Sequence, residues 1–438
     1  MKTTESTHAA PGHRASGKSA GTAVPVLIRD KKPVIGYGIG AVIALLFFAI
    51  GAPSALATFR LSSTGDVVEL PPLAIPSAAA GWVLAALLVA ATVYAWLNLR
   101  AGRKNPGWLA LTYGLAFLMA FLIWVVGSAN NPNISLITLL GGSIALALPM
   151  VFGSLSGVLS ERSGVVNIAI EGQLLLGAFA AAVGGSITQN VYVALICAAV
   201  GGVVVSALLA LFAIKYLVNQ IIVGVVLNVL VSGLTAFLFG TLLAPNADAL
   251  NSPPRLRSFS IPGLADIPIL GPLLFRQTLL GYLMFVAVAI VWFALYKTRW
   301  GLRVRAVGEH PKAADTVGIN VNRTRVINVL IGGAVAGLGG SYYTLVSVSQ
   351  FSRDMTAGAG FIALAALIFG RWNPLGAFFA ALLFGFATNL QYVLAQAGTA
   401  VPSQFMAMLP YVVTIFAVAG LVGKSRGPAA AGEPYVKG

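Results

Sequence analysis

The sequence predicts an all-α polytopic membrane protein with about 11 to 12 transmembrane helices, and three observations support this prediction. Hydrophobic residues make up 58% of the 438 residues and charged residues only 9%, and the mean hydropathy is +0.89. A soluble domain carries about 25% charged residues, so this chain lacks the polar side chains needed to cover a water-facing surface. Apolar runs of roughly 20 residues, long enough to cross a bilayer as a helix, recur along the sequence.

The first 30 residues differ in composition from the apolar runs. They are rich in Ser, Thr, Gly, Ala and basic residues without hydrophobic periodicity, so we interpret 1–30 as a disordered cytoplasmic tail. The tail contains GHRASGKS at 12–19, which matches the phosphate-binding pattern G-x-x-x-x-G-K-[ST]. That pattern binds phosphate when a strand delivers its glycines onto a helix N-terminus, and no strand-like segment precedes Gly12. We interpret the match as coincidence and predict no catalytic residue on this chain.

The first apolar run, 34–57, follows two lysines. Its Ala55-Leu56-Ala57 resembles a signal-peptide cleavage site, but the run is longer than the hydrophobic region of such peptides, which favours a retained helix. The shortest run, 359–371, is interpreted as a re-entrant or broken segment, because it is too short to cross a bilayer. The other runs predict helices at about 79–98, 107–127, 134–157, 165–187, 191–214, 218–244, 277–297, 326–348, 374–396 and 404–423.

Basic residues gather between certain runs and set the predicted orientation, because Lys and Arg are retained on the cytoplasmic side. The loop 298–325 is the most basic and is predicted to be cytoplasmic, whereas the Pro- and Asn-rich loop 245–276 falls outside. Twelve crossings with both termini inside satisfy the pattern. The basic residues predicted to lie inside are Arg100, Arg103, Lys104, Arg299, Arg303, Arg305, Lys312, Arg323, Arg325, Arg371, Lys424 and Arg426.

The formal net charge of +15 would indicate nucleic-acid binding in a soluble protein. Here retention of basic residues in cytoplasmic loops explains the charge, and we predict no nucleic-acid partner. The single cysteine, Cys197, lies in an apolar run, which excludes a cysteine-built metal site. Two of the three histidines lie in the tail, so we predict no metal site.

The stretch LSERSGVVNIAIEGQLLLGAF at 159–179 places polar residues inside an apolar run. Asn167 and Glu171 are four residues apart, which on a helix puts both on one face, toward the bundle interior. A carboxylate at that depth costs about 3 kcal/mol or more, so it is paired or lines a watery path. Translocation and interhelical hydrogen bonding are both open for this pair. Gly164 and Gly172 would allow a broken helix, which is typical near substrate sites.

Two further intramembrane amides are candidates for the same pathway. Asn228 lies in NQIIVGVVLNVLVSGL at 219–234, and Asn389 lies in FATNLQYV. Amides suit a neutral, hydrogen-bonding solute such as a nucleoside or a sugar. The alternative for each is a hydrogen bond that holds helices together.

Two segments have similar local sequences, LLGAFAAA at 175–182 and PLGAFFAA at 374–381. Transporters are often built from two related halves with broken helices, so the pair is consistent with a duplication. Helices that pack through small residues often contain such short motifs by chance, and this alternative stays open.

The loop RWGLRVRAVGEHPKAADTVGINVNRTRV at 299–326 is too charged to lie in lipid. Pro311 suits the first turn of a short helix and Gly318 is placed to end it. The predicted apolar stripe of this helix consists of Ala313, Ala314 and Val317. A membrane-surface helix is the alternative to a partner-docking helix, but Glu309 and Asp315 would be unfavourable against anionic lipid. The sequence favours docking to a cytoplasmic partner.

Three stretches together carry a family resemblance. ERSGVVNIAIEGQLLLGAF, RAVGEHPKAADTVGINV and FIALAALIFGRWNPLGA resemble membrane subunits of bacterial ABC importers in the ribose and branched-chain amino acid permease superfamily. The resemblance is closest to the general nucleoside or simple-sugar permeases and covers about 134–423. It implies additional N-terminal transmembrane helices at 31–133, a permease domain at 134–423 and a cytoplasmic C-terminal tail at 424–438.

The resemblance also implies the partners of the chain in a bacterial plasma membrane. It implies cytoplasmic ABC ATPase subunits that bind ATP and magnesium, a second related permease and an extracellular substrate-binding lipoprotein, with no cofactor on this chain. The loop 298–325 would be the coupling loop that docks on the ATPase. The residues matched to it are Arg305, Gly308, Glu309, Pro311, Ala313, Ala314 and Gly318.

The expected function is therefore the permease subunit of an ATP-driven importer, with nucleosides as the expected solutes. Simple sugars or branched-chain amino acids are the alternative solutes. An ion-coupled secondary transporter would need a titrating intramembrane carboxylate, and Glu171 is the obvious candidate in a span. A polytopic membrane enzyme would need a catalytic cluster at one membrane face, and the charged set at 299–325 is more typical of docking.

Overall fold

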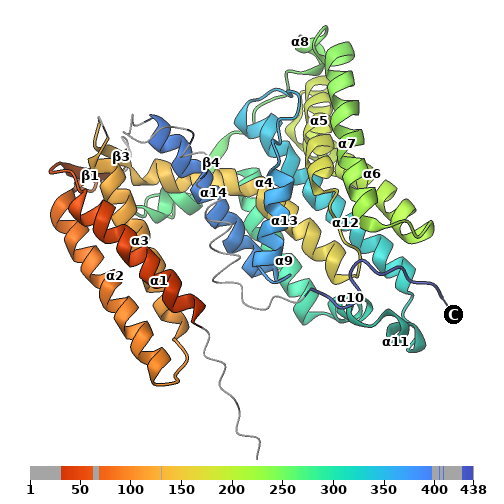
Figure 1. The fold of residues 1–438 in the computed structure, drawn as a ribbon. Coiled ribbons are helices and arrows are strands. Elements are labelled where there is room, and N and C mark those ends of the chain that lie inside the picture. Colours follow the sequence, from red (N-terminus) through yellow and green to blue (C-terminus); the bar gives the residue numbers. More distant parts are fainter. Residues whose placement is uncertain are drawn as a thin grey trace, which may run out of the picture.

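The computed structural model describes residues 31–62, 69–129, 131–396, 404, 408 and 427–437 as a bundle of helices (Figure 1). Within these residues, ten helices are long and apolar enough to cross a membrane. The spans, including π-helical ends, are Lys32–Ile50, Ser77–Arg100, Gly107–Gly127, Leu136–Arg162, Ile170–Thr188, Val191–Lys215, Gln220–Leu243, Leu279–Lys297, Val321–Ser347 and Pro374–Gln396. The prediction of an all-α polytopic membrane protein is confirmed. The predicted run 404–423 lies almost wholly outside the described residues, as does GHRASGKS.

The α-helices follow the predicted apolar runs closely. They are α1 (Lys32–Ile43), α2 (Ser77–Arg100), α3 (Gly107–Gly127), α4 (Leu136–Arg162), α5 (Ile170–Thr188), α6 (Val191–Ala210), α7 (Gln220–Leu238), α8 (Ala247–Leu250), α9 (Leu279–Lys297), α10 (Arg299–Glu309), α11 (Pro311–Thr316), α12 (Val321–Tyr342), α13 (Ala359–Phe369) and α14 (Pro374–Gln396). The π-helical segments are η1 (Ala44–Ile50), η2 (Leu211–Lys215), η3 (Phe239–Leu243), η4 (Gly271–Phe275) and η5 (Tyr343–Ser347).

The prediction of one helix across 34–57 is wrong at its C-terminal end. The helix ends at Ile50, because Gly51 and Pro53 interrupt it and proline disfavours a helical conformation in the residue before it. The strand β1 (Leu56–Arg60) follows and pairs antiparallel with β2 (Leu73–Pro76) and parallel with β3 (Asn133–Ser135). A second small sheet joins β4 (Ser258–Ser260) to β5 (Arg276–Thr278). Neither sheet was predicted.

The apolar run at 359–371 forms α13, which has only 11 residues. At 1.5 Å per residue it is about 17 Å long, roughly half the hydrocarbon thickness of a bilayer. The prediction of a broken segment is confirmed by this length. The left-handed residue Gly358, with φ +84°, begins the helix.

Small residues let α6 and α12 approach each other closely in the bundle centre. A Cβ added at Gly202 would clash with the carbonyl oxygen of Gly333, and one added at Gly337 would clash with that of Ala198. Glycine is therefore required at these crossings, as is common where helices pack in membranes.

The two segments LLGAFAAA and PLGAFFAA lie on α5 and at the start of α14, and the duplication remains a prediction.

The helices α1, α2 and α3 form a layer at one side of the bundle (Figure 1). Phe48 and Tyr113 lie in the apolar cluster that holds these three helices together. A second cluster joins Ile123 and Val126 of α3 to Leu390 and Leu394 of α14. The N-terminal helices are thus packed onto the rest of the chain.

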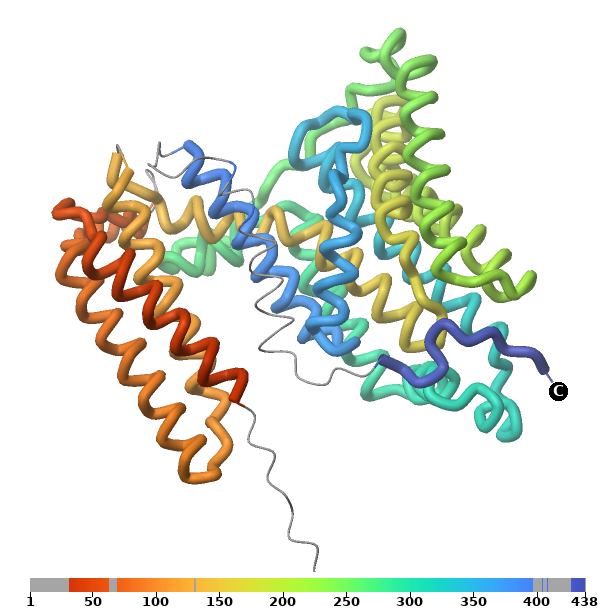
Figure 2. Tube along the Cα trace, viewed as in Figure 1, coloured from red at the N-terminus to blue at the C-terminus, as the bar shows by residue number. Residues whose placement is uncertain are grey.

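Basic segments gather at one end of the bundle. The turn after α2, the α10–α11 segment and the C-terminal segment lie toward the lower end of the view, and α8 lies at the top (Figure 1). In Figure 2 the C-terminal segment, drawn in dark blue, crosses below the ends of the spans near α11. This arrangement agrees with the predicted grouping of the basic loops.

Candidate functional site

The break between α4 and α5 organises the centre of the bundle. α4 ends at Arg162, and Gly164 adopts φ +93°, a left-handed conformation that favours glycine. A non-helical segment at 165–169 then leads to α5, which begins at Ile170. The prediction of a broken helix here is confirmed. The expectation that Asn167 and Glu171 share one helical face is wrong, because Asn167 precedes the helix.

Asn167 is fully buried in a network of polar side chains. Its amide nitrogen donates to the Ser156 hydroxyl at 3.1 Å and to the Gln173 side-chain oxygen at 3.2 Å. The Gln173 amide nitrogen donates in turn to the Ser206 hydroxyl on α6 at 2.8 Å. Three helices and the break are joined through these contacts. The bonds explain why 165–169 is not helical, since the Asn167 side chain holds the chain in place there.

Asn228 on α7 holds the same break from the other side. Its side-chain oxygen accepts from the Gly172 backbone nitrogen at 2.8 Å, and its nitrogen donates to the Ile168 carbonyl at 2.9 Å. Eight residues earlier on α7, the Gln220 side chain accepts from the Val166 nitrogen at 2.7 Å. At 1.5 Å per residue these contacts are about 12 Å apart along α7, so the start of α5 lies deep within the bundle.

Glu171 joins the N-termini of two helices. Its Oε1 accepts from the Thr356 hydroxyl at 2.6 Å and from the Gly358 backbone nitrogen at 2.9 Å, and its Oε2 accepts from the Gly360 nitrogen at 2.6 Å. Glu171 itself lies in the first turn of α5, while Gly358 and Gly360 begin α13. A helix N-terminus carries a partial positive charge. The Glu171 carboxylate therefore offsets the partial positive charge at the N-termini of both α5 and α13.

A tyrosine lies near this junction, and no sequence pattern predicted it. Tyr343 of η5 is within electrostatic range of Glu171, Tyr342 and Tyr392. The rings of Tyr342 and Tyr343 pack edge to face with centroids 5.6 Å apart. Such aromatic faces offer flat apolar surfaces with polar tips. Tyr342 is buried and Tyr343 is partly buried, so Tyr343 is the more accessible of these two rings.

Asn389 lies apart from the junction, near the start of α4. Its side-chain nitrogen donates to the carbonyl of Leu139 at 2.6 Å and to that of Thr138 at 3.4 Å. The contact joins α14 to α4. The structure thus brings Asn167, Glu171 and Asn228 together around the break and leaves Asn389 elsewhere.

The segment at 298–325 differs from the predicted loop with one short helix. α10 begins after Thr298, whose side chain accepts from the Gly301 nitrogen, and this cap was not recognised in the sequence. The predicted short helix is confirmed as α11, and Gly318 follows it with φ +83°. α12 already begins at Val321, so the last five residues of the predicted loop belong to a span.

Three of the predicted coupling residues face the spans. The Arg305 guanidinium lies 5.2 Å from the ring centroid of Tyr296 on α9. A Cβ at Gly308 would clash with the carbonyl oxygen of Arg162. Ala314 is 3% exposed and packs with Val307. These residues fix α10 and α11 to the transmembrane helices.

The outer face of α10, α11 and the turn after α11 exposes apolar side chains among charged ones such as Arg303 and Lys312. Leu302 is 62% exposed and Val317 is 74% exposed. Ala313 and Glu309 are also exposed, whereas Pro311 is partly buried. Exposed apolar side chains beyond the ends of the spans indicate a surface for a partner.

The C-terminal segment closes over the inner side of this region. Ala430 donates to the Gly308 carbonyl at 2.9 Å, and Gly432 donates to the Gly164 carbonyl at 3.3 Å. The segment therefore links the α10–α11 region directly to the break before α5. The sequence predicted this tail only as cytoplasmic, from the placement of Lys424 and Arg426.

Tyr435 anchors this C-terminal segment. It is 7% exposed and packs with Val307, Ala314 and Val321. Burial raises the pKa of the Tyr435 hydroxyl above its ordinary value of 10.0, and a hydrogen bond and negative charge from Asp315 act in the same direction. The neutral phenol is therefore the form that fits this site.

The sequence of this chain is similar to those of known permeases. Residues 139–418 match the family model described as branched-chain amino acid transport system / permease component. The guanosine ABC transporter permease protein NupQ of Bacillus subtilis is 40% identical over 68% of this chain and 95% of its own length. The nucleoside ABC transporter permease protein NupC of Lactococcus lactis is 39% identical over 66% of this chain and 93% of its own.

A third relative is named as a sugar permease. The putative glucose ABC transporter permease protein TsgC13 of Haloferax volcanii is 36% identical over 58% of this chain and 76% of its own. No solved structure matches the chain. The family match covers well over half of the sequence, with most of α4 and all the elements from α5 to α14. The chain is a multi-pass membrane protein that belongs to the permease components of ABC transport systems of the branched-chain amino acid type.

Proposed function

We propose that this chain is the permease subunit of an ATP-driven importer of nucleosides in a bacterial plasma membrane. The observation that carries the solute class is its 39–40% identity to a nucleoside and a guanosine permease along nearly their whole length. The glucose relative keeps simple sugars as the second candidate.

The Glu171 junction supports a neutral solute. In transporters, the positive N-termini of broken helices commonly bind an anionic group of the substrate. Here the Glu171 carboxylate already accepts hydrogen bonds at the start of α13 and lies in the first turn of α5. A solute carboxylate would have to compete with it, which disfavours amino acids. A nucleoside base could instead pack on the partly buried ring of Tyr343 near Glu171.

The proposed pathway passes beside this junction. Glu171 is half-buried and lies nearest to it, together with Tyr343. Asn167 and Asn228 would shape the pathway from behind, by holding the break open between α4 and α5. Asn389 would act at a greater distance, through the contact of α14 with α4.

Coupling to ATP would enter through α10 and α11. The outer apolar face with Leu302 and Val317 would dock on a cytoplasmic ATPase subunit that carries ATP and magnesium. The inner contacts of Gly308 and Ala314, together with the C-terminal segment, would transmit its movement to the break before α5. A second related permease and an extracellular binding lipoprotein complete the proposed assembly. The basic end of the bundle, with both termini, would be cytoplasmic.

The experiment is to purify the full-length chain with its associated subunits and to measure solute-stimulated ATP hydrolysis. We expect stimulation by guanosine or another nucleoside delivered with the binding protein, and none by leucine. Stimulation by glucose alone would replace the nucleoside proposal by the sugar one, and the absence of any associated ATPase would refute ATP coupling.

The docking face has its own test. Val317→Asp introduces a charge on a side chain that is 74% exposed, so the fold should tolerate it while the ATPase is lost from the purified complex. Val348→Asp is the matched control, because Val348 is 60% exposed and lies at the far end of the span that follows α11. Equal ATPase retention in both variants would contradict the docking face.

A further inference from the structure

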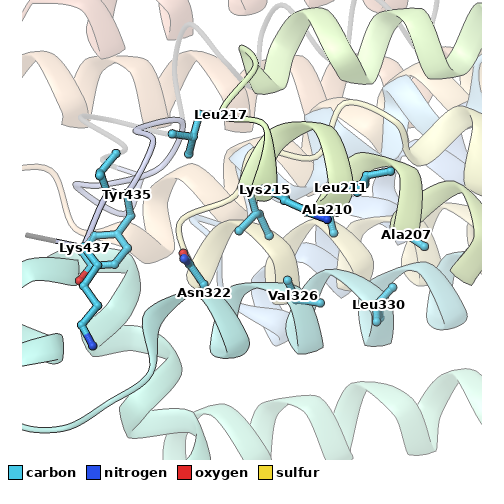
Figure 3. A pocket seen from close by; sticks show the side chains of 12 residues that line it. Ala207, Ala210, Leu211, Lys215, Leu217, Asn322, Val326, Leu330, Tyr435 and Lys437 are labelled. Carbon is cyan, nitrogen blue, oxygen red and sulfur yellow. The ribbon is translucent and has the colours of Figure 1, made fainter.

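A cavity of about 720 Å³ lies between α6, η2, α12 and the C-terminal segment. Figure 3 shows its lining. Along one end lie Ala207, Leu211, Val326 and Leu330, and toward the other end lie Asn322, Tyr435 and Lys437. The cavity is thus apolar at one end and polar at the other. Neither the proposed pathway nor the docking face uses it.

The apolar end belongs to the transmembrane helices. Ala207 and Leu211 lie within the span that ends at Lys215, and Leu330 lies within the span that begins at Val321. Ala207 and Leu211 are exposed, so this wall is open to the hydrocarbon of the bilayer. A long apolar chain could lie along it without leaving the membrane.

The polar end lies at the membrane boundary. Lys215 is the last residue of its span and Asn322 is the second residue of the other. Lys437 lies beside Tyr435 at the outer end of the cavity (Figure 3). The two lysines are the charged residues among those that line the cavity, and both are exposed. Cationic groups at this level attract the headgroups of anionic lipids.

We propose that this cavity binds a phospholipid with an anionic headgroup. One acyl chain would lie along the α6–α12 wall, and the anionic headgroup would be attracted at the membrane boundary by Lys215 on the α6 side and Lys437 on the C-terminal segment. An acyl chain fits this wall because its exposed side chains are apolar and lie within the membrane spans. The site depends on the membrane boundary and not on which solute the protein transports.

The bound lipid would stabilise the C-terminal segment. Tyr435 lines the cavity and also packs on Val307 and Ala314 of the coupling region. A lipid that fills the cavity would press Tyr435 onto Ala314. Lipid binding would therefore strengthen the contact between the C-terminal segment and α11.

The test uses the full-length chain, with its associated subunits, in nanodiscs that contain labelled phosphatidylglycerol in a phosphatidylcholine background. Retention of the labelled lipid is measured by native mass spectrometry. The double variant Lys215→Gln with Lys437→Gln should weaken retention by about 30-fold, since each lysine near an anionic lipid contributes roughly fivefold. Ala207→Trp should abolish retention by filling the apolar end.

Matched controls separate this site from general lipid contacts. Lys312→Gln removes a lysine of α11, and Val200→Trp places the same tryptophan side chain at an exposed position of α6. Neither residue lines the cavity. Both controls should retain the lipid as the unchanged protein does. Equal loss in the controls, equal retention of phosphatidylcholine, or competition by inorganic phosphate alone would overturn the proposal. ATPase stimulation by solute, measured in parallel, tests the transport function separately.

Discussion

The substitution Glu171→Gln removes one negative charge at the meeting point of α5 and α13 while it keeps the size of the side chain. The carboxylate accepts from Thr356, Gly358 and Gly360. In glutamine an NH₂ group replaces one carboxylate oxygen, so at least one of these donors faces another donor. The lost hydrogen bond to a charged group costs about 1.5–3 kcal/mol. Loss of the charge at two helix N-termini adds about 0.3–1 kcal/mol each. The expected destabilisation is about 2–5 kcal/mol.

The assay is thermal unfolding of the purified protein, followed by solute-stimulated ATP hydrolysis at a temperature where the variant is folded. We expect a lower unfolding midpoint and a higher nucleoside concentration for half-maximal stimulation. Asp248→Asn is the control, because Asp248 is an exposed carboxylate in α8. A midpoint for Glu171→Gln equal to that of the unchanged protein would refute the reasoning. A lower midpoint with unchanged nucleoside dependence would leave Glu171 as a helix-joining residue outside the pathway.

Three further predictions concern packing and the C-terminal segment. Gly337→Ala should destabilise the bundle by about 1–3 kcal/mol in thermal unfolding, because its Cβ would clash with the Ala198 carbonyl, whereas Gly233→Ala, with open space around it, should not. Asn228→Leu should cost about 1–3 kcal/mol for each of the two backbone groups that it leaves unpaired, and equal midpoints would contradict this. The pKa of Tyr435 is raised above its ordinary value of 10.0, so the neutral hydroxyl stabilises the docked C-terminal segment fully below pH 10. This stabilisation should be lost as the pH rises through the raised pKa. Protease access to the C-terminus should then increase at high pH in the unchanged protein, and Tyr435→Phe should remove this pH dependence.

The sequence predicted the spans well, because each is an apolar run with polar ends. The run at 107–127 has the bounds of α3 in the structure. Predictions failed where local sequence does not decide the conformation. The apolar run was expected to be helical from residue 165, but side chains from α4, α5 and α7 hold 165–169 out of a helix. Such long-range contacts leave no periodic signal.

The site residues divide in the same way. Glu171 and Asn167 were recognisable because polar groups are rare in an apolar run, yet their partners come from segments distant in sequence, such as Thr356. α10 was missed because its basic residues resemble a loop, although Thr298 caps it. The docking of Tyr435 on Ala314 could not be predicted, since the C-terminal segment has no regular pattern.

The central claim is that this chain imports nucleosides with energy from ATP on partner subunits. The most direct measurement is accumulation of radiolabelled guanosine by cells that depend on this chain, with the ion gradient collapsed or with ATP depleted. Uptake is expected to persist without the ion gradient, to stop without ATP and to be lost when the chain is deleted. Uptake that follows the ion gradient, or deletion without any effect on nucleoside uptake, would contradict it.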